Sequence, residues 1–344
     1  MMSLQHDSLP YLDDPAFTLP TGAPAPVDPQ IAEFMRLMAK DAAQYPRRDT
    51  LPIEEGRANA EKVRLPWAQG GPQMARTVNT EVATRHGKVR VRIHYPAERR
   101  LPGAFMYIHG GGFVLFSIDT HDRVMREYAE RAGIVVIGID YTRAPEAKFP
   151  QPLEECVDVL RWIAAQAREL SIDADQLFIG GDSAGANLSM GTALTLRDEG
   201  QGGLIKGIVL NYGGFSSNLF RNSVVRYGAG DYGLSLHMMI WFRGLHIRHG
   251  KDFFDPRVDI MRADLRQLPP VWMVVTECDP LHDDSIELER LLKAAGVDVS
   301  AKVYRGTVHS FLEAVSISDA AVQAFEDTAS WLHGERVAHG AHSA

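Results

Sequence analysis

The chain has 344 residues, of which 45% are hydrophobic and 23% charged, which is typical of a globular protein with ample material for a large core. Its formal net charge of -8 and the absence of a long basic run argue against nucleic acid or an anionic membrane as the main partner. The two cysteines, Cys156 and Cys278, provide neither a disulfide framework nor a zinc set.

The first thirty residues are rich in proline and aspartate and show no sustained period, as in an extended arm. They lack the basic and apolar regions of a signal peptide. No apolar run in the chain approaches the ~18 residues needed to span a bilayer. We therefore expect a cytoplasmic protein without membrane insertion.

A helix is predicted after Asp28 and Pro29, which form a cap followed by a proline in the first turn. Apolar residues then recur at helical spacing, namely Ile31, Phe34, Met35 and Met38. This amphipathic helix either packs on the core or forms part of a lid over a pocket.

The chain changes character from about Val89, where residues 89–95 alternate as a half-buried strand should. Later strands are nearly continuous apolar runs at 104–108, 134–139, 177–179, 207–210 and 271–275, and a last strand-like segment covers 299–304. Helical segments such as 153–167 and 285–295 separate most of them. This alternation predicts an α/β fold with a mostly parallel sheet and helices on both faces.

A long interruption, residues 214–265, separates two of these strands and is richer in aromatic residues, methionine and histidine. It forms either a second lid element or an ordinary peripheral helix. Within it, the segment GAGDYG at 228–233 satisfies the dinucleotide-binding pattern G-x-G-x-x-G. Because no clear buried strand precedes this segment, we interpret it as a turn of the lid.

The segment Gly181-Asp182-Ser183-Ala184-Gly185 places one serine between two glycines, after an apolar strand and before an amphipathic helix. Strand, turn and helix are the context that the G-x-S-x-G nucleophile elbow requires. Glycine at both ends lets strand and helix approach while the serine Oγ points outward. Ser183 is therefore the candidate nucleophile, although such clusters often mark only a turn.

A serine hydroxyl needs a base, and the base needs an acid that fixes its tautomer. With this elbow the chain order is serine, acid, histidine. Asp279 follows the strand 271–275, and His309 follows the last strand. Both therefore lie at the carboxyl ends of strands, where a parallel sheet carries its functional site. Asp283 and Asp284 are rivals for the acid, but we place them on the following helix.

An oxyanion hole is the third requirement, because the tetrahedral intermediate carries negative charge on the former carbonyl oxygen. The loop His109-Gly110-Gly111-Gly112-Phe113 follows an apolar strand and matches the HGGG pattern of such sites. We assign the oxyanion hole to backbone N–H groups of Gly111, Gly112 and Ala184. Gly110 is a further candidate, because the sequence leaves the donors of the glycine loop open by one residue. We expect His109 to brace the loop rather than transfer protons.

These motifs together resemble the bacterial hormone-sensitive-lipase-like esterases, a family of α/β-hydrolases. The resemblance covers the chain from about residue 85 onward. It rests on HGGGF at 109–113, DYTRAPEAKFPQPLEE at 140–155, GDSAGAN at 181–187, LPPVWMVVTECDPLHDD at 268–284 and AGVDVSAKVYRGTVHSF at 295–311. It departs from the family at Ser310 and Ser285, which stand where glycine is usual.

The resemblance implies an α/β-hydrolase fold with a helical cap, no cofactor, and carboxylic ester hydrolysis by Ser183, Asp279 and His309. It also implies that such proteins are often homodimers joined along an edge strand and the last helix. We expect residues 1–85 to form the N-terminal arm and cap helices, residues 86–344 the catalytic domain, and residues 214–265 a cap insertion.

The expected partner is a small-molecule ester with a short- to medium-chain acyl group. A cap over the triad is expected to line the pocket with apolar residues that favour apolar over charged esters. These are Phe34, Met35, Met38, Met238, Met239, Trp241 and Phe242. The simpler alternative is that most of them are core residues.

Other functions remain open. Amide or lactone cleavage uses the same groups, because these substrates also pass through an oxyanion. A catalytically inactive binding protein, like the plant gibberellin receptors that resemble this family, is expected to lack the base, and His309 is present. The sequence shows neither a Ser-x-x-Lys nucleophile nor metal-ligand spacing such as H-E-x-x-H, so we expect no metal site.

Overall fold

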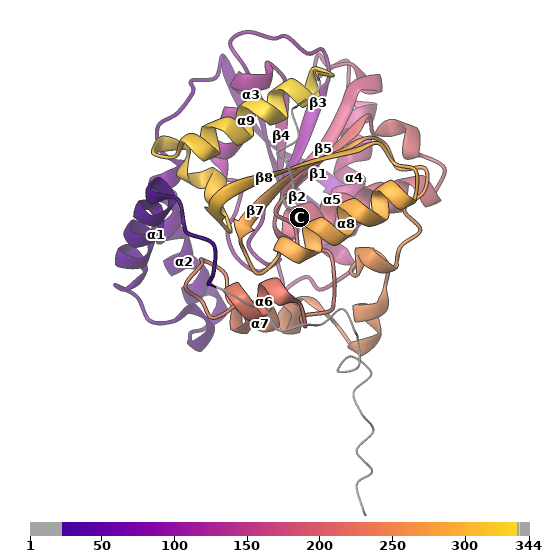
Figure 1. Ribbon diagram of the computed structural model, residues 1–344. Helices are drawn as coiled ribbons and strands as arrows, with labels where there is room; N and C mark the ends of the chain where they lie inside the picture. The colour runs from indigo at the N-terminus through magenta and orange to yellow at the C-terminus, as the bar shows by residue number, and fades with distance from the viewer. Residues whose placement is uncertain (1–22, 336, 338–344) are drawn as a thin grey trace, which may run out of the picture.

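A mixed eight-stranded sheet forms the centre of the computed structural model, which describes residues 23–335 and 337 (Figure 1). The spatial order is β1-β2-β4-β3-β5-β6-β7-β8. Strands β1 and β2 form an antiparallel hairpin and β2 pairs antiparallel with β4, whereas all later pairs are parallel. The strands are β1 (Arg76–Thr84), β2 (Gly87–Tyr95), β3 (Ala104–Ile108), β4 (Val135–Asp140), β5 (Leu177–Asp182), β6 (Gly207–Asn211), β7 (Val271–Cys278) and β8 (Val299–Val308).

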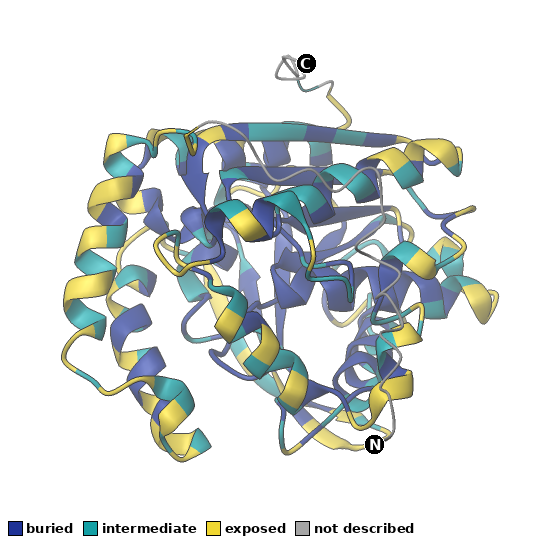
Figure 2. Cartoon of the chain, turned by 60° about the horizontal axis from the view of Figure 1, so that its bottom comes forward, coloured by how far each residue is buried: buried dark blue, intermediate teal, exposed yellow. Residues whose placement is uncertain are grey.

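Helices cover both faces of this sheet, as the sequence predicts. One face packs against α3 (Asp122–Ala132) and α9 (Asp319–Leu332). The other packs against α4 (Gln151–Ala165), α5 (Ala184–Asp198) and α8 (His282–Ala294). Figure 2 shows the strands in the middle of the sheet, β3 to β7, almost entirely buried, while the outer helices expose one side. None of the described helices is long and apolar enough to cross a membrane.

The strand β1 was not predicted, because its side chains are mostly polar and Val82 alone among them is buried. As an edge strand it needs only one covered face, so it lacks the apolar run that identifies β3 or β4. The expected boundary at residue 85 falls in the turn of the β1–β2 hairpin. The sheet therefore begins at Arg76, before that boundary.

Four more helices gather beyond one end of the sheet, at the left and bottom of Figure 1. They are α1 (Pro29–Ala42), α2 (Ile53–Arg64), α6 (Asn222–Tyr227) and α7 (Leu236–His246). Helix α1 begins where predicted, because the Asp28 carboxylate accepts hydrogen bonds from the backbone N–H groups of Gln30 and Ile31. Asp49, between α1 and α2, pairs with His237 of α7 at 2.6 Å. The N-terminal helices and the 214–265 insertion are thus in contact.

Candidate active site

Ser183 lies in the tight turn between β5 and α5, with φ 53° and ψ -117°. This is a strained conformation for a residue with a side chain. The flanking glycines allow it: a Cβ on Gly181 would lie 2.0 Å from the Ile108 carbonyl oxygen, and one on Gly185 would lie 1.9 Å from the same atom. Only glycine at both positions lets β3, β5 and α5 meet this closely. The close packing around the elbow therefore offsets the unfavourable backbone conformation of Ser183.

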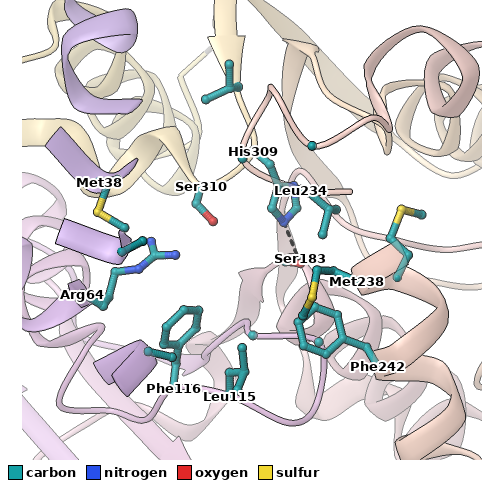
Figure 3. A pocket seen from close by; sticks show the side chains of 18 of the residues that line it. Met38, Arg64, Leu115, Phe116, Ser183, Leu234, Met238, Phe242, His309 and Ser310 are labelled. Carbon is teal, nitrogen blue, oxygen red and sulfur yellow. Dashed lines mark hydrogen bonds between the residues drawn. The ribbon is translucent and has the colours of Figure 1, made fainter. Parts of the chain in front are cut away.

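The three residues expected to form a triad are brought together. The Nε2 atom of His309 lies 2.9 Å from Ser183 Oγ, and its Nδ1 lies 2.8 Å from Asp279 Oδ2. His309 directly follows β8, and Asp279 directly follows the neighbouring strand β7. Figure 3 shows His309 pointing at Ser183 on the wall of a cavity. With Nδ1 protonated, His309 presents an unprotonated Nε2 to the serine.

Asp279 is fully buried and uses both carboxylate oxygens. Oδ2 also accepts from the Thr276 hydroxyl at 2.6 Å, and Oδ1 accepts from the Leu281 N–H at 2.8 Å. Burial alone would raise the pKa of this carboxyl, but the adjacent His309 and these hydrogen bonds hold the pKa below its ordinary value. Asp279 is thus kept ionised, as the partner of a catalytic histidine must be.

The two rival acids serve other purposes. Both lie on α8, as expected. Asp283 accepts from the Ser223 N–H at 2.8 Å, and Asp284 accepts from the N–H groups of Phe215 and Ser216. These bonds attach α8 to the start of the 214–265 insertion.

The glycine loop after β3 gives one correction to the expected oxyanion hole. The Gly110 N–H donates to Asp182 Oδ1 at 3.0 Å, so this donor is already occupied and we withdraw Gly110 from the set. Within the described residues, no hydrogen bond occupies the N–H groups of Gly111, Gly112 or Ala184. All three residues line the cavity beside Ser183, where a developing oxyanion needs donors.

Asp182 precedes the nucleophile and ties the elbow to the glycine loop, a role that the sequence did not reveal. Besides Gly110, it accepts from the Tyr107 hydroxyl at 2.6 Å and lies 3.5 Å from His121 Nε2. Burial raises its pKa, but His121 and Tyr107 outweigh burial and bring the pKa to about 2. The carboxylate therefore stays charged and holds the loop in place.

His121, Asp182 and Glu313 bring three potential metal-ligand atoms within 4.8 Å of one another. These groups face one another and a cation: His121 Nε2 lies 3.5 Å from Asp182 Oδ2 and 3.8 Å from Glu313 Oε1, and Arg64 pairs with Glu313. A metal ion would sit beside the Arg64 guanidinium and be repelled by it. We interpret the cluster as an ionic network rather than a metal site.

His109 has the bracing position expected of it. Its ring stacks on Tyr141 with a centroid distance of 4.5 Å, and its Nδ1 lies 2.8 Å from the Gly110 carbonyl oxygen. The Tyr141 hydroxyl in turn donates to the His109 carbonyl at 3.1 Å. Neither contact involves Ser183, which fits a structural role.

A cavity of about 690 Å³ opens at Ser183 and His309 (Figure 3). Helices α1, α2 and α7 contribute much of its lining, so we call them its roof. Of the seven lining residues predicted from the sequence, six line this cavity, namely Phe34, Met35, Met38, Met238, Met239 and Phe242. Trp241 does not, and instead packs against the cluster around Val114 and Phe116. It is withdrawn from the site.

Two arginines of the cavity wall, Arg48 and Arg64, were missed. The signal for Arg64 lay in helical spacing, since α2 buries Gly56, Ala60 and Val63 on the same side as Arg64. A basic residue at the end of such a stripe is usually solvated, so the pattern gave no reason to place it in a pocket. Arg48 lies in a single turn of helix between α1 and α2, where no periodicity exists.

Comparison with known proteins agrees with this geometry. Residues 105–313 match a family model described as alpha/beta hydrolase fold. The chain belongs to the α/β-hydrolase family. The matched range of this α/β-hydrolase includes the glycine loop, the turn at Ser183, Asp279 and His309.

Solved structures of esterases superpose on this α/β-hydrolase over most of its length. A hyperthermophilic esterase from the archaeon Pyrobaculum calidifontis is 32% identical, with a TM-score of 0.84, and the alignment covers 90% of this chain and 98% of that one. An ester hydrolase from the metagenome of Lake Arreo, complexed with a bipyridine phosphonate derivative, is 30% identical over 90% and 98% with a TM-score of 0.84. A thermostable carboxylesterase from a metagenomic library is 31% identical over 83% and 98%, with a TM-score of 0.79. These likenesses support the resemblance to hormone-sensitive-lipase-like esterases.

Proposed function

We propose that this protein is a carboxylesterase that cleaves short- to medium-chain acyl esters through an acyl-enzyme on Ser183. The observation that carries the proposal is the continuous hydrogen-bonded line from Asp279 through His309 to Ser183, ending at a cavity. The similar structures are named esterase, ester hydrolase and carboxylesterase, which supports an ester as the substrate.

In the first half-reaction, Nε2 of His309 takes the proton of Ser183 Oγ as this oxygen attacks the ester carbonyl. The carbonyl π electrons move to the oxygen, which becomes the oxyanion and accepts from the N–H groups of Gly111, Gly112 and Ala184. The tetrahedral intermediate then collapses. The bond to the alcohol oxygen breaks, and His309 gives its proton to the departing alcohol.

In the second half-reaction, His309 removes a proton from water, which attacks the acyl-enzyme carbonyl. The second tetrahedral intermediate expels Ser183 Oγ, which regains its proton from His309. Asp279 stays ionised throughout and stabilises the imidazolium that forms in each half-reaction. A general base acts only in its unprotonated form, so activity should fall at acid pH. An activity that stays constant down to acid pH would contradict His309 as the base.

The test compares wild type, Ser183→Ala and His309→Ala on short- and long-chain p-nitrophenyl esters, with circular dichroism to verify folding. Hydrolysis of the short esters by wild type, with both folded variants near background, supports the mechanism. Activity retained by folded Ser183→Ala would overturn the acyl-enzyme. A wild type that cleaves only amides or lactones would keep the triad and replace the substrate class.

We also propose a homodimer in which β8 and α9 meet their copies, because β8 ends the sheet and, among the described residues, no further strand pairs with its outer edge. Size-exclusion chromatography with light scattering measures this directly, and a monomer at micromolar concentration would refute it. The cytoplasmic location stays a prediction.

A further inference from the structure

The cavity beside Ser183 carries more positive than negative charge. Among the described residues, its lining includes Arg36, Arg48, Arg64 and Arg243 and one acidic residue, Asp231, which is exposed to solvent. Two of these arginines are accounted for by their neighbours. Arg36 pairs with Glu33 at 2.7 Å, and Arg243 donates to the backbone carbonyls of residues 216 and 217. Arg48 and Arg64 remain.

Arg64 is 7% exposed, which is unusual for a guanidinium. It pairs with Glu313 on one side and lies over the Phe116 ring, 4.5 Å from the ring centroid. Its Nε atom has no hydrogen-bond partner among the described residues. Burial lowers the pKa of Arg64 to about 10, and the positive charge of Arg48 adds to this lowering. Arg64 therefore has an unsatisfied buried donor and lies in a site that disfavours its charge.

Arg48 has no hydrogen bond and no ion pair through its side chain within the described residues. The carboxylate of its neighbour Asp49 is taken by Arg47 at 2.9 Å and by His237 at 2.6 Å. Burial lowers the pKa of Arg48 as well. A partly buried guanidinium without a partner is costly, and an anion in the cavity would relieve that cost.

Ser310 completes this corner of the cavity. It directly follows His309 and has a left-handed backbone, with φ 67°. Figure 3 shows the Ser310 hydroxyl and the Arg64 guanidinium both pointing into the cavity, on the side away from Met238 and Phe242. The Ser310 Oγ makes no hydrogen bond to any described residue. We call Arg48, Arg64 and Ser310 the cationic corner.

We propose that the cationic corner binds a carboxylate carried by the substrate, so that the preferred substrates are esters with a second, free carboxylate remote from the reacting carbonyl. Guanidinium groups bind carboxylates through charge-assisted hydrogen bonds, and a serine hydroxyl adds a neutral donor. The inference deepens the proposed function and rests on it. It also reverses the expectation from sequence that charged esters are disfavoured, because that expectation counted only the apolar lining.

The test measures kcat/KM for matched esters that differ only in the terminal carboxylate. Monomethyl adipate against methyl hexanoate places the carboxylate on the acyl side. The acetate ester of ω-hydroxyhexanoate against hexyl acetate places it on the alcohol side. Wild type should prefer the charged ester in one pair, and that pair identifies the side of the ester that reaches the corner.

The variants decide whether the corner causes the preference. Arg48→Met should lower the charged-to-neutral ratio of kcat/KM about tenfold, the loss expected for one charge-assisted hydrogen bond. Arg64→Met combined with Glu313→Gln should act in the same direction without leaving an unpaired buried carboxylate. Lys40→Met is the control, because Lys40 is an exposed cation of α1 that does not line the cavity. Its ratio should equal that of wild type.

The two possible failures are distinguishable. If wild type cleaves methyl hexanoate or hexyl acetate but prefers both neutral esters, or if the ratio is unchanged in both corner variants, the carboxylate site is overturned while the esterase function stands. If folded wild type cleaves no ester at all, the proposed function and the carboxylate site are both overturned.

Discussion

The hydrogen bonds of Asp279 determine what the substitution Asp279→Asn should do. The Leu281 N–H donates to Oδ1, so an asparagine must keep its single acceptor oxygen there. Its NH₂ group then takes the place of Oδ2 and faces His309 Nδ1. The Thr276 hydroxyl can turn and accept from this NH₂ group, but Nδ1 of His309 must lose its proton. The ring proton then moves to Nε2 and points at Ser183, where a base is needed.

The expected loss is about 10⁴-fold in kcat, as for the same change in serine proteases, which corresponds to about 5.5 kcal/mol of transition-state stabilisation. KM should change little, because Asp279 does not line the cavity. Steady-state kinetics on p-nitrophenyl butyrate measure both constants. Asp283→Asn is the control, since Asp283 holds only the Ser223 N–H and the start of α6, and it should stay within about threefold of wild type. An Asp279→Asn enzyme with a tenth of wild-type kcat would refute this account of the tautomer.

Three further substitutions test other parts of the site. Gly111→Ala should lower kcat about 10²-fold on p-nitrophenyl butyrate, because its N–H would be displaced as an oxyanion donor. The φ of Gly111 is 110°, and the new Cβ would lie 2.3 Å from the Leu115 carbonyl oxygen. A folded variant with wild-type kcat would exclude Gly111 as an oxyanion donor. Phe242→Ala removes a ring that packs against the glycine loop and should raise the octanoate-to-butyrate ratio of kcat/KM roughly threefold to tenfold, whereas an unchanged ratio would place the acyl chain elsewhere. The pKa of Asp182 is about 2 in the folded protein, whereas the ordinary pKa of this carboxyl is 3.8. A carboxyl whose pKa is lowered by folding stabilises the folded state above its ordinary pKa, and this stabilisation is lost as the pH falls through the pKa of the folded state. The free energy of unfolding, measured with urea, should therefore fall more steeply between about pH 4 and pH 2 in wild type than in Asp182→Asn, and equal slopes would contradict the shift.

Much of the fold could be predicted because parallel strands buried on both faces leave continuous apolar runs. Strand β5 was predicted only as far as Ile179, since Gly180, Gly181 and Asp182 continue it without any apolar signal. The triad could be predicted because its order along the chain and its position after successive strands follow from the topology.

What the sequence did not predict depends on side-chain direction. Trp241 and Phe242 are adjacent on α7, so they point about 100° apart around the helix, and of the two only Phe242 lines the cavity. The N–H group of Gly110 already donates to the Asp182 carboxylate, which is distant in sequence, whereas the N–H group of Gly111 does not. The glycine pattern alone does not distinguish the two residues. Arg48 and Arg64 were missed for a similar reason, because a charged side chain is expected to be solvated and the sequence does not show that these two line the cavity.

The roof and the catalytic groups come from different parts of the chain. The roof joins two segments through Asp49 and His237, 188 positions apart, whereas Ser183, Asp279 and His309 all extend from the sheet. Mutations that reshape the roof can therefore accumulate without disturbing the reaction itself. Substrate specificity can then change faster in evolution than the catalytic mechanism. A directed-evolution library confined to α1, α2 and α7 would sample new substrates from a background that stays catalytically competent.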